Sequence, residues 1–217
     1  MTYAAYDLPL FSADSVTKAP MKVLVACEWS GIVRNAFLAR GHDAWSCDLL
    51  PSEDGSNRHI RGDVRDVLHD GWDFLMVAHP PCTRLCNSGV RWLHKPPKGK
   101  TLSDMWQELK EAAALFSDLL HAPIDRICVE NPVMHKYAKA EIRDYREFSQ
   151  SIQPWQYGHG EVKRTCLWLK NLPLLCPTNI VSGREARVHK MPPSEDRWKE
   201  RSRFFDGVAQ AMAHQWG

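Results

Sequence analysis

The sequence predicts one α/β domain built on a doubly wound, mostly parallel β-sheet. At 217 residues, with 44% hydrophobic and 25% charged residues, the chain is long enough to bury one sizeable core. Short apolar runs that fit buried strands alternate with segments of helical periodicity. This alternation is typical of parallel sheets, whose ligands bind outside the carboxyl ends of the strands. Functional residues are therefore expected directly after the predicted strands.

The first half of the chain gives strand, helix, strand, helix, strand. Residues 1–20 lack periodicity and are expected to form an N-terminal tail with little regular structure, and the domain is predicted to span residues 21–217. Gly41 and Asp48 mark the ends of the first helix and the second strand. The predicted elements are a strand at 21–26, a turn at 28–31, a helix at 32–40, a strand at 43–47, a short segment to residue 60, a brief helix at 64–68 and a strand at 74–78.

The second half begins with the longest predicted helix. Ser103 is a suitable N-cap for a helix that continues to about His121 and carries an apolar stripe. Residues 172–202 contain four prolines and are predicted to be a loop rather than a folded insert. The remaining predicted elements are a strand at 126–129, a helix at 139–151, a strand at 165–169 and a closing helix at 204–215.

Composition and cysteine content exclude several classes of protein. No apolar run approaches the roughly 18 residues of a membrane span, and no basic segment followed by an apolar core begins the chain, so a cytoplasmic protein is expected. Seven cysteines without paired spacing suit free thiols better than a disulfide scaffold. Cys82 and Cys86 have no second Cys or His pair at ligand spacing, so no metal site is expected.

The most informative feature is a cysteine after a buried strand. Pro80-Pro81-Cys82 follows the apolar run at 74–78. Because proline fixes its own φ and restricts the residue before it, the backbone sets the position of this thiol. A thiol held there can act as a nucleophile, and a buried, inert cysteine is the alternative. Glu130 closes the strand at 126–129 and is expected at the same edge of the sheet.

Two aspartates also fall at strand exits. Asp48, at the end of the second strand, is placed to accept hydrogen bonds from ribose hydroxyls, and Asp63 is placed to accept one from an adenine amino group. Each aspartate taken alone is more often a helix cap or a turn former. Together they favour a site for a nucleoside cofactor whose charged portion lies against the turn ending at Gly31.

A basic stretch follows Cys82, although the net charge of +2 does not by itself indicate a nucleic-acid partner. A mobile basic loop beside a nucleophile suits a phosphate-rich substrate, and a merely solvated loop is the alternative. A second basic region, at 184–203, is diluted by acidic residues and indicates less. The basic residues of the first stretch, uninterrupted by any acidic residue, are Arg84, Arg91, His94, Lys95, Lys98 and Lys100.

These motifs resemble those of a known family. Pro80-Pro81-Cys82, Glu130-Asn131-Pro132, the turn ending at Gly31 and the closing segment at 207–212 occur in the order found in DNA (cytosine-5) methyltransferases, and the chain looks like a compact member carried by bacteriophages. The resemblance covers about residues 21–170 and the last helix. It implies a Rossmann-like, class I methyltransferase fold, S-adenosylmethionine as methyl donor, and DNA as partner, with the target base flipped out.

The resemblance also implies roles for individual residues, with no metal. The implied catalytic residues are Cys82, as the nucleophile, and Glu130, as the residue that grips the base. The implied cofactor-binding residues are Cys27, Glu28, Trp29, Ser30, Gly31, Asp48, Asp63 and Pro80. The implied substrate-binding residues are Arg84, Arg91, Lys95, Asn131, Lys163 and Thr165.

The chain departs from the family pattern in its first turn. The family has Phe-x-Gly-x-Gly-Gly there, whereas residues 26–31 keep only the final glycine. Glu28 is then expected to face the ammonium group of the donor, with backbone amides facing its carboxylate.

Two further departures concern the substrate. Glu161, Lys163 and Thr165 stand where the family has Gln-x-Arg-x-Arg, and lysine is not equivalent to arginine at a bidentate site. Only residues 172–202 occupy the place of the family's recognition domain. A short or relaxed sequence preference, action on single strands, or recognition through a partner is therefore expected.

Other functions stay open at this point. A catalytically inactive, nucleic-acid-binding relic of the same fold explains the altered first turn and the missing recognition domain. Pyrimidine modification in RNA or in a free nucleotide uses similar thiol chemistry, although no folate-site signature or Arg-rich phosphate clamp is present for the latter. A monomer is the expected oligomeric state.

Overall fold

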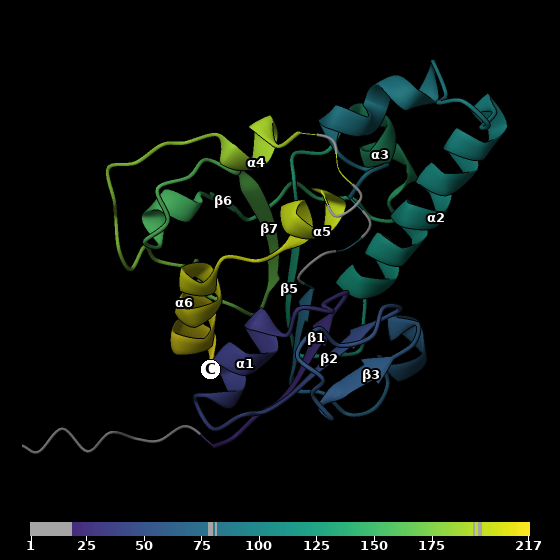
Figure 1. Cartoon of the computed structure of the whole chain (residues 1–217). Coiled ribbons are helices and arrows are strands. Elements are labelled where there is room, and N and C mark those ends of the chain that lie inside the picture. The colour runs from purple at the N-terminus through teal and green to yellow at the C-terminus, as the bar shows by residue number, and fades with distance from the viewer. Residues whose placement is uncertain (1–18, 78–79, 81, 193, 195–196) are drawn as a thin grey trace, which may run out of the picture.

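The computed structural model describes residues 19–77, 80, 82–192, 194 and 197–217. In these residues the chain forms a seven-stranded sheet with helices on both faces (Figure 1). Most of the predicted tail, and positions 78, 79 and 81 at the predicted strand exit, lie outside the described residues. The strands are β1 (Lys22–Ala26), β2 (Asp43–Asp48), β3 (His59–Arg61), β4 (Phe74–Val77), β5 (Arg126–Asn131), β6 (Gln150–Ile152) and β7 (Thr165–Lys170).

The sheet is mixed and mostly parallel. Its order is β3-β2-β1-β4-β5-β7-β6, and all pairs from β3 across to β5 are parallel. β7 runs antiparallel to both of its neighbours, β5 and β6. The predicted α/β class with a mostly parallel sheet is confirmed, and the antiparallel strand between β5 and β6 is a feature that the sequence pattern did not predict.

The direction of winding reverses between β1 and β4, which are neighbours in the sheet. From β1 the chain moves outward through β2 to β3 and then returns to β4 on the other side of β1. In an open parallel sheet, the crevice at such a reversal lies outside the carboxyl ends of the strands and is the usual ligand site. The topology therefore places the turn at 27–31 and the segment around Cys82 on either side of this crevice.

Two apolar layers cover the faces of the sheet. The layer containing α2 (Leu102–Leu120) includes Phe116, which packs edge-on against Trp168 of β7 with ring centroids 5.2 Å apart. The other layer contains α1 (Ile32–Leu38) and α6 (Asp206–Trp216) (Figure 1). The other helical elements are η1 (Val64–Val67), η2 (Asn87–Leu93), α3 (Lys136–Glu141), η3 (Pro154–Gln156), α4 (Arg187–Lys190) and α5 (Arg197–Ser202).

The N-terminus of α2 corrects the predicted cap. Thr101, not Ser103, is the N-cap: its Oγ1 accepts from the Asp104 amide at 3.1 Å, and Asp104 Oδ2 accepts from the Thr101 amide at 2.7 Å. This reciprocal pair is a capping box and satisfies two backbone donors that would otherwise lack partners. The Thr-x-x-Asp pattern is therefore the stronger signal here.

The predicted helix at 139–151 is wrong. α3 ends at Glu141, and Asp144 has a φ of 49°. Ile142 is buried, and Phe148 packs against Trp168 with ring centroids 6.0 Å apart, both from an irregular segment. With Tyr145, which packs against the same apolar cluster, these residues recur every three positions and so resemble one face of a helix.

Two other segments differ from prediction. β5 continues two residues past the predicted end, so Glu130 and Asn131 are paired with Leu167 and Cys166 of β7 instead of following the strand. The predicted loop at 172–202 contains the short helices α4 and α5. No helix in the described part of the chain combines the length and apolarity that a membrane span requires.

Candidate active site at the carboxyl end of the sheet

Cys82 begins a tight turn on the chain that leaves β4. Its carbonyl oxygen accepts hydrogen bonds from the amides of Leu85 and Cys86 at 3.0 and 2.9 Å. The Cys82 residue is half-buried, and Pro80 before it is buried. Cys86 closes the turn as the N-cap of η2, and its Sγ lies 3.0 Å from Ser88 Oγ. The backbone therefore fixes the position of both sulfurs.

A buried histidine ties this turn to the segment that follows β5. The His135 amide donates to Leu85 O at 3.1 Å. The ring Nδ1 accepts from the Ala138 amide at 3.0 Å, so the ring Nε2 carries the proton and donates to Arg84 O at 2.7 Å. The turn at Cys82 and the segment that follows Glu130, far apart in sequence, are thus held in one fixed arrangement.

Glu130 lies in β5 with a buried carboxyl group. Only 7% of the residue is exposed. Burial raises the pKa of Glu130 from 4.5 to about 7, and the nearby Lys163 ammonium opposes this shift. Near neutral pH this carboxyl group can therefore both hold and release a proton.

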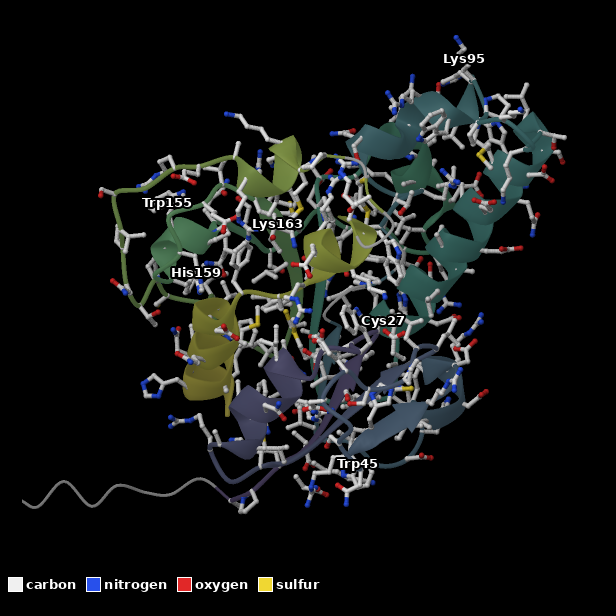
Figure 2. All side chains as sticks on the ribbon, in the orientation of Figure 1. Cys27, Trp45, Lys95, Trp155, His159 and Lys163 are labelled. Atoms are coloured by element: carbon white, nitrogen blue, oxygen red, sulfur yellow. The ribbon has the colours of Figure 1, made fainter. Side chains whose placement is uncertain are left out.

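Glu130, Lys163 and Thr165 line one small cavity of about 20 Å³, enough for about one water molecule. Lys163 Nζ donates to Arg201 O at 2.8 Å, so the end of α5 closes over this cavity. Figure 2 shows Lys163 near the middle of the molecule, beside α5. The other lining residues are Ile152, Pro154, Phe204, Phe205 and Val208.

Cys82 does not line this cavity, but it lies within electrostatic reach of it. The thiol donates a hydrogen bond to Cys86, and this bond, together with burial and the negative charge of Glu130, raises the pKa of Cys82. The Lys163 ammonium acts in the opposite direction and favours the thiolate. The structure thus brings Cys82, Glu130 and Lys163 together, in accordance with the predicted shared edge.

Replacing Gly89 with alanine is expected to displace the turn that carries Cys82. A Cβ at Gly89 would lie 1.9 Å from the backbone oxygen of Thr83, which cannot move without moving the turn. We expect a loss of about 1–3 kcal/mol in the free energy of unfolding, measured by urea denaturation.

Gly62→Ala is the matched control for this substitution. A Cβ at Gly62 meets no atom within 4 Å, so its unfolding midpoint is expected to stay close to that of the wild type. Equal midpoints for Gly89→Ala and the wild type would contradict the close approach of Gly89 to Thr83.

The predicted cofactor residues meet at the ends of β1, β2 and β3. Burial and the negative charges of Asp48 and Asp63 raise the pKa of Cys27 far above its usual range. Asp48 Oδ1 accepts from the Leu50 amide at 2.9 Å, and burial raises the pKa of Asp48. The electrostatic coupling shows that the three side chains are neighbours, and the excess of carboxylates favours a cationic ligand here.

Asp63 also has a structural role. It is the N-cap of η1, and its Oδ1 accepts from the Arg65 amide at 3.0 Å. Its hydrogen bond with the Arg65 guanidinium lowers the pKa of Asp63. The helix cap, which is the alternative role for Asp63 in the sequence analysis, is therefore present. Asp63 already accepts hydrogen bonds from Arg65, so fewer of its lone pairs are available to a ligand.

Glu28 requires a correction. Its fully buried carboxylate accepts from the amides of Val33 and Arg34 at 2.7 and 3.1 Å, at the start of α1. It serves the helix N-terminus and does not face a ligand's ammonium as predicted. Gly31 adopts a φ of 75°, and a Cβ there would lie 2.3 Å from Arg34 Nη2, so glycine is required because the buried guanidinium packs on the turn.

The rest of the first turn leaves one polar atom unused. Ser30 Oγ accepts weakly from the Ile32 amide at 3.5 Å. Trp29 Nε1 is buried and has no hydrogen-bond partner among the described residues. An orphaned buried donor is costly, so it marks a position where a bound ligand can supply the missing acceptor.

The predicted substrate residues are scattered. Arg84 is paired with Glu108, with Nε 2.6 Å from Oε2, and Arg91 stacks on Trp92. Lys95 is exposed at the outer end of the molecule, far from Lys163 (Figure 2). Of the predicted substrate-binding residues, the structure brings only Lys163 and Thr165 to the cavity.

The side chain of Asn131 has one polar atom with a hydrogen-bond partner and one without. It is fully buried in β5; its Nδ2 donates to Pro132 O at 2.8 Å, while Oδ1 has no partner in the described residues. Of the basic stretch before α2, only Arg91 lies in η2, and His94, Lys95, Lys98 and Lys100 follow it in an exposed, irregular segment.

Sequence reasoning missed two parts of the site. Cys86 was considered only as a metal ligand, although a cysteine followed by Asn-Ser-Gly fits a helix N-cap that can stabilise a thiolate. Phe204 and Phe205, which line the cavity, and Arg201, whose carbonyl oxygen accepts from Lys163, lie in and after the predicted loop and carry no sequence signal. No group of three or more metal-binding side chains is found among the described residues.

Comparison of the sequence with models of protein families gives no match, and comparison with curated proteins gives no significant relative.

Proposed function

We propose that this chain is a DNA cytosine methyltransferase that uses S-adenosylmethionine and forms a covalent cysteine adduct. The observation that carries this proposal is the arrangement of Cys82 and the buried Glu130, both close to Lys163, on two segments that His135 connects. A class I methyltransferase fold is part of the proposal. The sheet order, with one antiparallel strand between β5 and β6, supports it.

Cys82 is assigned the role of nucleophile. Addition of its sulfur to carbon 6 of cytosine turns the ring into an enamine whose carbon 5 can accept a methyl group. The resting thiol is protonated, and Cys86 Sγ is the acceptor that its proton already faces. Lys163 stabilises the thiolate that remains after the proton leaves.

Glu130 is assigned the role of proton donor to the base. With a pKa of about 7, it can hold the proton that ring nitrogen 3 needs as negative charge builds up during sulfur addition. Protonation of Glu130 also removes the negative charge that disfavours the Cys82 thiolate. Both effects favour the protonated form of the Glu130 carboxyl group.

The residues at the ends of β1 and β2 fit the methyl donor in part. The donor supplies an electrophilic methyl group on a positively charged sulfonium. The acidic environment of Cys27 and Asp48 suits the sulfonium cation, and the unpaired Trp29 Nε1 can donate a hydrogen bond to an oxygen or ring nitrogen of the same molecule. Glu28 does not contribute, since its carboxylate is used by α1.

Binding of the base requires the segments that cover the cavity to move. A cavity of about 20 Å³ is far too small for a pyrimidine ring, so α5 and the Phe204-Phe205 segment have to move when the flipped base binds. α5 carries basic residues around Trp198, of which 52% is exposed. An exposed indole among cations suits a nucleic acid with unstacked bases, which supports a DNA or RNA substrate over a free nucleotide.

The test is covalent trapping. The protein is incubated with tritiated S-adenosylmethionine and single- or double-stranded DNA that contains 5-fluorocytosine, whose fluorine prevents the final proton removal. We expect a labelled protein–DNA complex that survives denaturing electrophoresis. Donor binding without a complex on any DNA or RNA would instead support the nucleic-acid-binding relic.

A further inference from the structure

We propose that Cys82 and Cys86 form a reversible disulfide, so that this turn is a site of oxidation by hydroperoxides. The amide of Cys86 donates to Cys82 O at 2.9 Å, and the two thiols lie within hydrogen-bonding reach of each other. In helix-like backbone, Cα atoms four positions apart are about 6 Å apart. This lies inside the range of roughly 4.4–6.8 Å that disulfides span. Rotation of the two side chains is therefore enough to form the bond.

Cys86 is the sulfur that reacts first. Its hydrogen bonds from Cys82, from the Ser88 hydroxyl and from the amides of Ser88 and Gly89 lower the pKa of Cys86. Thiolates are the form of cysteine that reacts with peroxides. Cys82, which donates the strongest of these bonds, is already beside it.

The other cysteines of the described chain lack these properties. Burial raises the pKa of Cys27, Cys47, Cys128 and Cys166. Cys176 is exposed, and none of the interactions that lower the pKa of Cys86 is present at its sulfur. We therefore expect oxidation at Cys82 and Cys86 and not at the other cysteines of the described chain.

The proposed chemistry is balanced with hydrogen peroxide as oxidant. The Cys86 thiolate attacks one peroxide oxygen, the O–O bond breaks, and hydroxide leaves and takes up a proton to give water. The resulting sulfenic acid is attacked by Cys82 Sγ; the S–S bond forms, the S–O bond breaks, and the Cys82 proton leaves with the hydroxyl group as a second water. Two electrons pass from the two sulfurs to the peroxide. A dithiol such as dithiothreitol returns them by thiol–disulfide exchange.

The consequence for methyl transfer rests on the proposed function. A sulfur held in a disulfide cannot add to a pyrimidine ring, so oxidation is expected to stop methyl transfer and reduction to restore it. The disulfide itself does not depend on that function and is detected without any assay of activity.

Trypsin offers a direct measurement, because Arg84 lies between the two cysteines. Cleavage after Arg65, Arg84 and Arg91 places Cys82 in the peptide 66–84 and Cys86 in the peptide 85–91. After treatment with hydrogen peroxide and alkylation of free thiols, we expect these two peptides as one linked species in mass spectrometry. Dithiothreitol is expected to separate them.

Two variants serve as controls. Cys176→Ser removes the exposed cysteine and is expected to keep the linked peptides, whereas Cys86→Ser removes the proposed partner and is expected to lose them. Peroxide-treated wild type in which Cys82 and Cys86 are both alkylated, or Cys86 carries a sulfinic acid without linked peptides, would overturn the proposal. Linked peptides in a protein that never transfers methyl groups would leave the disulfide in place and count against the proposed function only.

Discussion

Replacing Cys82 with alanine is expected to abolish methyl transfer, lowering its rate by roughly 10⁴- to 10⁶-fold. The reason is that carbon 5 of cytosine becomes reactive only after a sulfur has added to carbon 6, and no other described cysteine is near both Glu130 and Lys163 in this way. The trapped complex with 5-fluorocytosine DNA is expected to disappear together with the activity. The measurement is tritium incorporation into DNA at saturating donor.

The fold of this variant is expected to survive. The turn is held by the Cys82 carbonyl, which accepts from two amides, and alanine keeps that carbonyl. The variant should therefore keep its unfolding midpoint and its affinity for the donor. Cys176→Ala, at an exposed cysteine, is the matched control and should keep full activity. Methyl transfer by Cys82→Ala at a rate near that of the wild type would exclude the covalent mechanism.

Strong periodicity and strand–helix alternation predicted most of the fold. The elements β1, α1, β2, η1, β4, α2, β7 and α6 lie within two residues of their predicted bounds, whereas β3 was not predicted as a strand. The errors arise where tertiary contacts replace local pattern. Phe148 and Ile142 pack on the core from an irregular segment, and the pairing of β5 with β7 extends β5 to Asn131.

The sequence predicted those residues of the site that lie at the carboxyl ends of the parallel strands. Cys82 and Glu130 lie at one edge because parallel strands end there, and that rule needs no side-chain detail. The role of Glu28 could not be predicted in the same way, because a carboxylate four residues before the first residue of a helix serves either a ligand or the helix N-terminus. Arg84 was assigned to substrate from charge alone, and only the structure shows its pairing with Glu108, twenty-four residues away.

Replacing Glu130 with glutamine is expected to lower the rate of methyl transfer by about 10²- to 10⁴-fold. Glutamine keeps the size of the side chain but cannot donate an acidic proton to ring nitrogen 3. In the wild type, the rate should fall as the pH rises through about 7, because Glu130 then loses that proton. Glu130→Gln should lose this falling limb of the pH profile, measured as single-turnover rates between pH 5.5 and about 9.

The pH dependence of the stability of Glu130→Gln tests the raised pKa of Glu130 without an assay of activity. The pKa of Glu130 is about 7 in the folded chain, above its ordinary value of 4.5, so the folded state holds a proton that the unfolded state releases in this interval. The contribution of Glu130 is thus most favourable at low pH and is lost as the pH rises through about 7. Glu130→Gln has no such loss, and its advantage in the free energy of unfolding should grow by about 3 kcal/mol from pH 4 to pH 8. Urea denaturation at both pH values measures this; an equal difference at the two would show that folding leaves the pKa of Glu130 near 4.5, so that its carboxylate is ionised near neutral pH and cannot protonate the base.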